Sequence, residues 1–252
     1  MNRSYRAFFL ILGLALSGAA RAEEIPWGRI DRGLAQLANG DGNAAAASFQ
    51  KARRADESGL AELLMDLTMA YVAGDFETGY RDRDLLDIAH RHFSVRHVPH
   101  AAVEKTLSRV RDLVKHPVEG TSSHYLRPLL CNLRLLSGDR ATDGEAVLEA
   151  SGTSSDMGPF IRPRPEFTPS PRLTDSAKRE HAAETVVIDA ELVLDSEGCP
   201  ASRKLLSPLP DPLVDQALAS LGWWAYEPAR YDGVAVSWKL PLNLRIQLVP
   251  EP

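Results

Sequence analysis

The chain has 252 residues, of which 44% are hydrophobic and 25% are charged, an ordinary composition for a globular protein. This composition argues against a collagen, a wholly disordered chain or a polytopic membrane protein, and the length suits one or two domains. The net charge is -5 and no long basic run occurs, so we do not expect a nucleic-acid-binding protein. Two cysteines are too few for a disulfide-rich scaffold or a four-cysteine zinc site.

The first 22 residues have the pattern of a secretory signal peptide. Two arginines precede an apolar run over 7–16, and an Ala-Arg-Ala sequence ends at Ala22. We expect cleavage after Ala22, which leaves 26 basic and 34 acidic residues and a net charge of -8 in a periplasmic protein. The alternative is an inner-membrane protein anchored by an uncleaved amino terminus, but a bilayer span needs about 20 apolar residues, roughly twice this run.

Residues 23–150 are predicted to form an all-helical domain. Apolar residues recur there at three- and four-residue steps, and β-branched residues, which favour strands, are sparse. The periodic stretches run over 27–37, 44–52, 60–71, 103–114 and 126–136.

Gly-Asp pairs recur at Gly40, Gly74 and Gly138, with spacings of 34 and 64 residues. A period of 34 residues is that of tetratricopeptide helix-turn-helix repeats, and the second spacing is close to two periods. The first unit resembles that family at its small, turn and aromatic positions, which are Gly33, Gly40, Ala45, Phe49 and Ala52. The resemblance implies that small side chains let two helices approach closely around Phe49. The alternative is an ordinary antiparallel helical domain, because the later units match poorly.

Residues 151–183 are predicted to be a linker, because five prolines and few apolar residues occur between 151 and 171. After residue 184 the apolar period changes to two, which predicts a small α+β domain over 184–252. The predicted order is a strand over 186–194, a strand over 204–206, a helix from Asp211 and a final strand over 236–248. Alternation in the final strand predicts one buried face and one solvated face.

This order of elements resembles the TonB carboxy-terminal domain family over about 185–249. The most specific part is Trp-Ala-Tyr-Glu-Pro-Ala at 224–229, which matches the family's Trp-x-aromatic-x-Pro-Ala signature. A turn glycine follows the first strand, although Glu197 stands where the family usually has aspartate. The segment at 165–169 loosely matches the family's upstream Pro-x-aromatic-Pro segment. The residues that carry the resemblance are Gly198, Trp224, Tyr226, Pro228, Ala229 and Gly233.

The resemblance implies a protein that binds an extended segment of an outer-membrane receptor by adding it as a strand beside its own last strand. Pro241 has no N–H to donate to a ladder, which agrees with an edge strand. The candidate partner-binding residues are polar residues of this strand, namely Ser237, Lys239, Asn243, Arg245 and Gln247. The alternative is that they are only solvated.

Two features depart from the TonB proteins that transmit force. Those proteins keep an uncleaved anchor that bears a histidine, and they have a long proline-rich spacer. Here the apolar run over 7–16 contains no histidine, and the linker is short. We therefore expect the binding mode without direct energy transduction.

Four of the seven histidines lie close together at His90, His92, His97 and His100. Imidazoles could bind zinc or copper. No His-Glu-x-x-His motif occurs, however, and such histidines are common in solvated turns. They are weak metal candidates, and we expect no metal site.

The two cysteines leave two possibilities open. Cys131 lies in an apolar run and is expected to be buried, whereas Cys199 follows the turn at Gly198 and is expected to be more exposed. An oxidising compartment would permit a disulfide that joins the helical region to the sheet domain, and otherwise both thiols are free.

No Gly-x-Ser-x-Gly motif and no phosphate-binding loop occurs, so we expect neither an enzyme nor a cofactor. The sequence therefore predicts an exported envelope protein of the TonB family that binds a protein partner in transmembrane transport. A second partner could occupy the helical domain, and membrane contact is expected only through partners. The alternatives are a periplasmic helical-repeat scaffold with no role in energy transduction, and a metal-binding protein.

Overall fold

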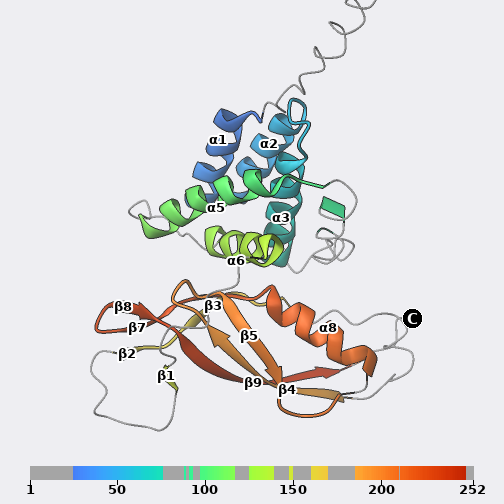
Figure 1. The fold of residues 1–252 in the computed structure, drawn as a ribbon, viewed down its shortest axis with the longest axis vertical. Helices are drawn as coiled ribbons and strands as arrows, with labels where there is room; N and C mark the ends of the chain where they lie inside the picture. Colours follow the sequence, from blue (N-terminus) through green and yellow to red (C-terminus); the bar gives the residue numbers. More distant parts are fainter. Residues whose placement is uncertain are drawn as a thin grey trace, which may run out of the picture.

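A computed structural model places five packed helices before antiparallel sheets that carry one further helix (Figure 1). The structure describes residues 25–75, 88, 91–92, 97–116, 125–138, 148–149, 160–169, 185–209 and 211–247. The predicted fold class, a helical region followed by a small α+β region, is confirmed. The predicted signal peptide lies outside the described residues. Within them, no helix has the length and apolar character that crossing a membrane requires.

The helices follow the predicted apolar stretches. They are α1 (Trp27–Ala38), α2 (Gly42–Arg53), α3 (Leu60–Asp75), α5 (His100–Lys115) and α6 (Leu126–Ser137). α2 begins where the Asp41 carboxylate accepts a hydrogen bond from the Ala44 N–H at 2.9 Å. Gly40 and Gly138 follow α1 and α6 with left-handed φ angles of 76° and 75°, which glycine adopts without strain. Gly74 differs, because it lies inside the last turn of α3.

α1 and α2 pack closely around Phe49, whose side chain is fully buried. A Cβ atom added to Gly33 would lie 2.4 Å from the Phe49 ring. Ala45 and Ala52 are fully buried on the same helix as Phe49. The close approach that the sequence predicts for this helix pair is therefore confirmed.

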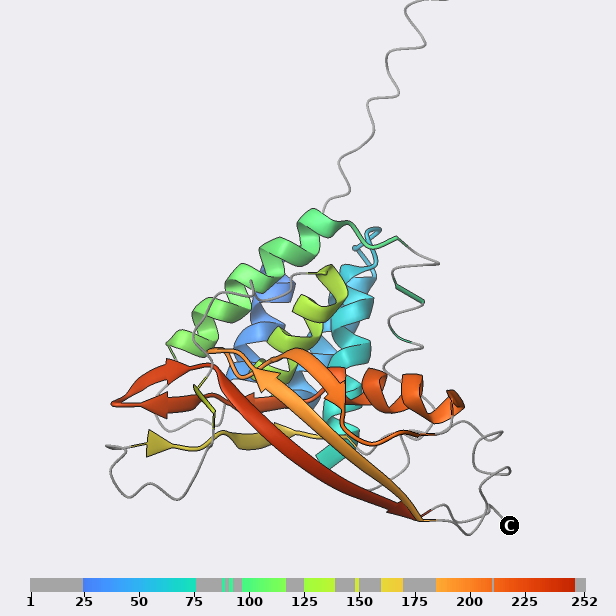
Figure 2. The ribbon, with the colours of Figure 1, turned by 60° about the horizontal axis from the view of Figure 1, so that its bottom comes forward.

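The carboxy-terminal region consists of short sheets and helix α8 (Asp211–Gly222). Its strands are β1 (Leu148–Glu149), β2 (Phe160–Ile161), β3 (Arg164–Phe167), β4 (Thr185–Leu194), β5 (Pro200–Leu205), β6 (Ala225–Glu227), β7 (Ala229–Tyr231), β8 (Val234–Val236) and β9 (Trp238–Gln247). The main sheet has the order β1-β9-β4-β5. Figure 2 shows the long β4–β9 pair crossing beneath the helical region.

One face of the main sheet packs on α8. Every second residue of β4 is buried there, as the alternating pattern predicts. The apolar cluster between sheet and helix contains Val186, Ile188, Ala190, Leu192, Leu194, Leu213, Ala217, Leu221, Trp224 and Tyr226. The predicted buried face of the final strand is confirmed at Trp238, which is 4% exposed.

Part of the expected linker is built into the fold. β2 pairs antiparallel with β7, and β3 pairs antiparallel with β6. The ring of Phe167 lies edge-on against Tyr71 of α3, with 5.1 Å between ring centroids. The segment over 160–169 therefore connects the sheets to the helices.

The two regions share one apolar core. Cys199, Trp223 and Ala225 belong to the same buried cluster as the side chains of the five helices. A disulfide joins Cys131 of α6 to Cys199. Both cysteines are buried, Cys131 at 3% and Cys199 at 5% exposure, so Cys199 is only marginally the more exposed of the two, because α6 packs over the turn that precedes it.

Candidate functional site

The candidate site is the outer edge of β9. β9 pairs with β4 along its whole length, from Thr185 opposite Gln247 to Leu194 opposite Trp238. On its other side, the only described partner is β1, which pairs with Trp238 and Lys239. From residue 240 to residue 247, this edge has no strand partner in the part of the chain that the structure describes.

The register determines which main-chain groups point to this edge. The Leu206 N–H donates to the Asp189 carbonyl oxygen at 2.7 Å, so the main-chain groups of Asp189 point towards β5. In an antiparallel pair of strands, residues that face each other alternate between pairs joined by main-chain hydrogen bonds and pairs that are not. Asp189 faces Asn243 and directs its main-chain groups to β5, so Asn243 makes no main-chain hydrogen bond with β4. Its N–H and C=O point to the open edge, as do those of Arg245, and the C=O of Pro241 points the same way. Pro241 thus sits where no ladder bond to β4 is lost.

Three predicted partner-binding side chains of β9 lie on the solvated face. The Lys239 ammonium lies 3.0 Å from the Glu191 carboxylate, and the Asn243 amide donates to the Asp189 carboxylate. Arg245 is exposed, and its side chain forms no ion pair or hydrogen bond with another described residue. Arg245 is therefore the cation on this strand that is open to a partner's negative charge.

The other two candidates have different surroundings. Ser237 is buried, with 5% exposure, and it lies just before β9. Gln247 ends β9, and its side chain lies outside the described part of the structure. A strand added beside 240–247 would therefore not meet Ser237 unless the chain rearranged.

Two of the residues that carry the family resemblance, Gly198 and Tyr226, meet at one turn. Gly198 has a φ of 86°, and a Cβ atom there would lie 1.9 Å from the Tyr226 carbonyl oxygen. The Tyr226 N–H donates to the Gly198 carbonyl oxygen at 3.0 Å. Pro228 follows the end of β6, as predicted, and the Trp224 indole N–H donates to the Pro169 carbonyl oxygen at 3.0 Å.

The final hairpin follows its prediction too. Asp232 and Gly233 both take positive φ angles, 49° and 78°, between β7 and β8. Positive φ at both central residues is what a tight two-residue hairpin turn needs, and Asp-Gly is a favoured pair for it. Ala229, also part of the signature, is fully buried at the start of β7.

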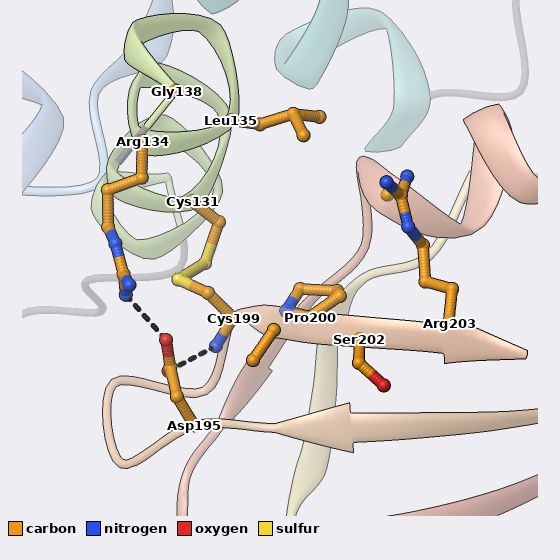
Figure 3. Close-up of a pocket in the computed structure, with 11 residues that line it drawn as sticks. Cys131, Arg134, Leu135, Gly138, Asp195, Cys199, Pro200, Ser202 and Arg203 are labelled. Atoms are coloured by element: carbon orange, nitrogen blue, oxygen red, sulfur yellow. Dashed lines mark hydrogen bonds and ion pairs between the residues drawn. A yellow bond between two sulfur atoms is a disulfide. The ribbon is translucent and has the colours of Figure 1, made fainter. Parts of the chain in front are cut away.

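An ion-pair cluster beside the disulfide holds the sheet against the helices. Figure 3 shows Arg134 and Cys131 on α6 pointing at the turn between β4 and β5. The Arg134 guanidinium lies 2.6 Å from the Asp195 carboxylate and 2.8 Å from the Glu197 carboxylate. Asp195 also accepts a hydrogen bond from the Cys199 N–H at 2.9 Å. The same carboxylate therefore orders the turn and pairs with α6.

Arg127 extends this cluster to β3. Its guanidinium donates to the Glu197 carbonyl oxygen at 2.7 Å and lies 3.1 Å from the Glu166 carboxylate. The pKa of Glu166 is raised from 4.5 to about 7, chiefly because the carboxyl is buried; Arg127 lowers the pKa, and the nearby Glu227 adds to the rise. Glu166, which lies at the junction of helices and sheets, therefore titrates near neutral pH.

Sequence reasoning left open the disulfide at this junction but missed its ion pairs, although a signal for them exists. Arg127, Cys131 and Arg134 stand four and three residues apart on α6, so they share one face of the helix. That face carries two arginines and a cysteine, although it packs against the sheet region. Their acidic partners, Asp195 and Glu197, lie two residues apart in the turn just before Cys199.

The junction also contains a hollow of about 350 Å³ (Figure 3). Arg134 is paired with carboxylates, and the Arg203 guanidinium donates to the Leu218 carbonyl oxygen of α8 at 2.9 Å. A Cβ atom on Gly222 would lie 1.9 Å from the same guanidinium, so the Arg203 side chain would have to shift to admit a larger residue there. Both cations of the hollow are therefore bound within the protein.

The predicted histidine cluster is spread over different surroundings. His92 is fully buried, and its Nε2 lies 3.0 Å from the Asp66 carboxylate, while His90 lies outside the described residues. His97 and His100 are exposed, and the His100 Nε2 lies 3.0 Å from the Ser137 carbonyl oxygen. Among the described residues, no group of three or more His, Cys, Asp or Glu could hold a metal ion.

Comparison of the chain with protein-family models, with curated proteins and with solved structures finds no match.

Proposed function

We propose that the protein binds an extended segment of a partner protein by adding it as a strand to the open edge of β9. The observation that carries this proposal is the direction of the main chain, because Asn243 and Arg245 offer N–H and C=O groups away from β4. Main-chain hydrogen bonds give affinity in this binding mode, and alternate side chains give specificity. β1 already pairs with two residues of the same edge, so the chain itself uses this edge for pairing.

The partner that fits the sequence resemblance is the energy-coupling segment of an outer-membrane receptor. Such a segment is extended, as strand addition requires. The exposed Arg245 guanidinium favours a segment with an acidic side chain near this position. Lys239 contributes less to this preference, because Glu191 already neutralises its charge.

An exported location, in the periplasm, agrees with the two cysteines. Disulfides form and persist in oxidising compartments and are rare in the cytosol. Cys131 and Cys199 are bonded to each other, and no other cysteine is present. The signal-peptide pattern over 1–22 supports the same location.

Two substitutions at one position separate the main-chain contribution from the side-chain contribution. Arg245→Pro removes an edge N–H and leaves the β4 ladder intact, as Pro241 does already. Arg245→Ala removes the same guanidinium but keeps the N–H. The ligand is a fluorescently labelled receptor energy-coupling peptide, and the readout is anisotropy.

We expect Arg245→Pro to weaken peptide binding at least about tenfold, because one main-chain bond is lost and a peptide carbonyl is left without a donor. Arg245→Ala should weaken it by only about threefold, the effect of one exposed charge. Equal binding by the wild type and Arg245→Pro, with both proteins folded by urea titration, would contradict strand addition at this edge.

A further inference from the structure

A basic hollow of about 390 Å³ lies between α1 and α2, and β9 plays no part in it. Figure 1 shows α1 and α2 at the end of the molecule away from the main sheet. The residues that line the hollow are Arg29, Arg32, Ser48, Lys51 and Arg54. No acidic residue lines it among the described parts of the chain.

The helix geometry brings these four cations together. Arg29 and Arg32 are three residues apart on α1, so they share a helix face. Lys51 lies in the last turn of α2, and Arg54 follows three residues later as the residue that caps the end of this helix. The Arg29 guanidinium donates to the Lys51 carbonyl oxygen at 3.0 Å, which ties the two helices together at the hollow.

Three carboxylates of neighbouring residues are engaged elsewhere, and the exposed Glu57 is not among the residues that line the hollow. Asp31 lies 3.1 Å from Arg109, and Glu62 lies 3.1 Å from Arg53. The Asp56 carboxylate accepts a hydrogen bond from the Ala61 N–H at 2.6 Å. The side chains lining the hollow therefore keep their positive charge largely uncompensated.

The cations themselves are available to a ligand. The side chains of Arg32, Lys51 and Arg54 are exposed and form no ion pair or hydrogen bond with another described residue. The chain as a whole carries a net charge of -5, so a local group of four cations stands out against an acidic background. Such a group attracts anions and raises their local concentration.

We propose that this hollow binds a phosphate-bearing ligand, a phosphate monoester or a diphosphate. A phosphate monoester concentrates nearly two negative charges on one compact group at neutral pH, whereas a carboxylate carries one. Guanidinium groups match phosphate oxygens with paired hydrogen bonds, and lysine adds a point charge. The phosphate can belong to the headgroup of a lipid or to a free small molecule, because both present the same oxygens.

Calorimetric titration of the full-length protein with pyrophosphate tests the site. We expect one equivalent to bind with a dissociation constant below about 1 mM at low salt. The double variant Arg32→Gln/Arg54→Gln should bind at least about tenfold more weakly, because charge-assisted hydrogen bonds are lost. The matched control is Arg162→Gln/Lys204→Gln, which removes the same charge from exposed positions on other elements and should change binding less than about twofold.

Three results would overturn the proposal. They are absence of binding up to about 10 mM pyrophosphate, an equal loss in the control variant, and equal binding of malonate, a dicarboxylate of similar size. A thermal melt that is unchanged in both double variants shows that the fold is intact, as expected for exposed positions.

Sedimentation with lipid vesicles distinguishes a lipid headgroup from a free phosphate ligand. Phosphatidylcholine vesicles with about 20% phosphatidic acid should sediment the wild type, but not Arg32→Gln/Arg54→Gln, if the phosphate is a lipid headgroup. Pyrophosphate binding without sedimentation assigns the site to a free phosphate ligand. Either result supports a phosphate site and names its source.

Discussion

The Tyr226 carbonyl oxygen occupies the space that a side chain on Gly198 would need. The distance from this oxygen to an ideal Cβ atom at position 198 is 1.9 Å, and the φ of Gly198 is 86°. Two sequence features that lie far apart, a turn glycine and an aromatic signature residue, therefore depend on one close contact between main chains. The contact holds the turn after β4 against β6, next to the disulfide at Cys199.

Gly198→Ala should lower the free energy of unfolding by at least about 2 kcal/mol, because alanine adds both a steric conflict and a strained φ. Gly233→Ala is the matched control. Its φ is 78°, but nothing lies within 4 Å of an added Cβ, so only the strain of about 1 kcal/mol applies. Urea unfolding of both variants measures the difference, and equal losses would show that the Tyr226 contact is unimportant.

Loss of the disulfide should destabilise the protein by about 4 kcal/mol, because the bond closes a loop between residues 68 positions apart. The measurement is urea unfolding of the wild type with and without reductant. Cys131→Ala/Cys199→Ala should match the reduced wild type and should not respond to reductant. A wild type whose stability is unchanged by complete reduction contradicts the role of the bond as a clamp between helices and sheet.

The pH dependence of stability should reflect Glu166. Its pKa is about 7 in the folded protein, raised chiefly by burial from 4.5, so the folded state favours the protonated acid. The contribution of Glu166 to the free energy of unfolding is fully present below about pH 4.5 and is lost as the pH rises through about 7. The free energy of unfolding should fall by an amount on the order of 3 kcal/mol over this range. Glu166→Gln should flatten this part of the profile.

Glu191→Gln is the control for this profile, because Glu191 pairs with Lys239 on the sheet surface. It should retain the decline between about pH 5 and pH 8 that Glu166→Gln removes. A Glu166→Gln profile that falls as steeply as the wild type over this range would assign the titration to another group.

Two glycines of α1 give opposite predictions. Gly33→Ala should destabilise the protein by about 1–3 kcal/mol, because its Cβ would lie 2.4 Å from the Phe49 ring in a packed core. Gly28→Ala meets nothing within 4 Å and should stabilise the helix by up to about 1 kcal/mol. Thermal melts of the two variants should move in opposite directions. A shift of both in the same direction would contradict the close approach of α1 and α2.

Local periodicity predicted most of the fold. The helices around Leu34 and Leu64 follow the helical period, and β4 and β9 follow the period of two. The short strands β2 and β3 could not be predicted in this way, because a proline-rich segment carries little apolar pattern. They form because distant partners in β6 and β7 supply their ladders.

The candidate site was only partly predictable. The polar residues of the last strand identified Lys239, Asn243 and Arg245 on the solvated face, but Ser237 is buried. The direction of the main-chain groups depends on which neighbour bonds to Asp189, and this is set by pairing with β5 rather than by the sequence of β9. The junction at Arg134 was missed for a similar reason, because its carboxylate partners lie on another element.

Amide hydrogen exchange along β9 tests the central claim most directly. In the free protein, the N–H groups of Asn243 and Arg245 should exchange fast because they face the open edge, whereas those of Leu242 and Leu244 bond to β4 and should exchange slowly. Addition of a receptor energy-coupling peptide should slow exchange at Asn243 and Arg245 and leave Leu242 and Leu244 unchanged. Slow exchange at Asn243 and Arg245 without any peptide would show that this edge is already covered, which would contradict strand addition.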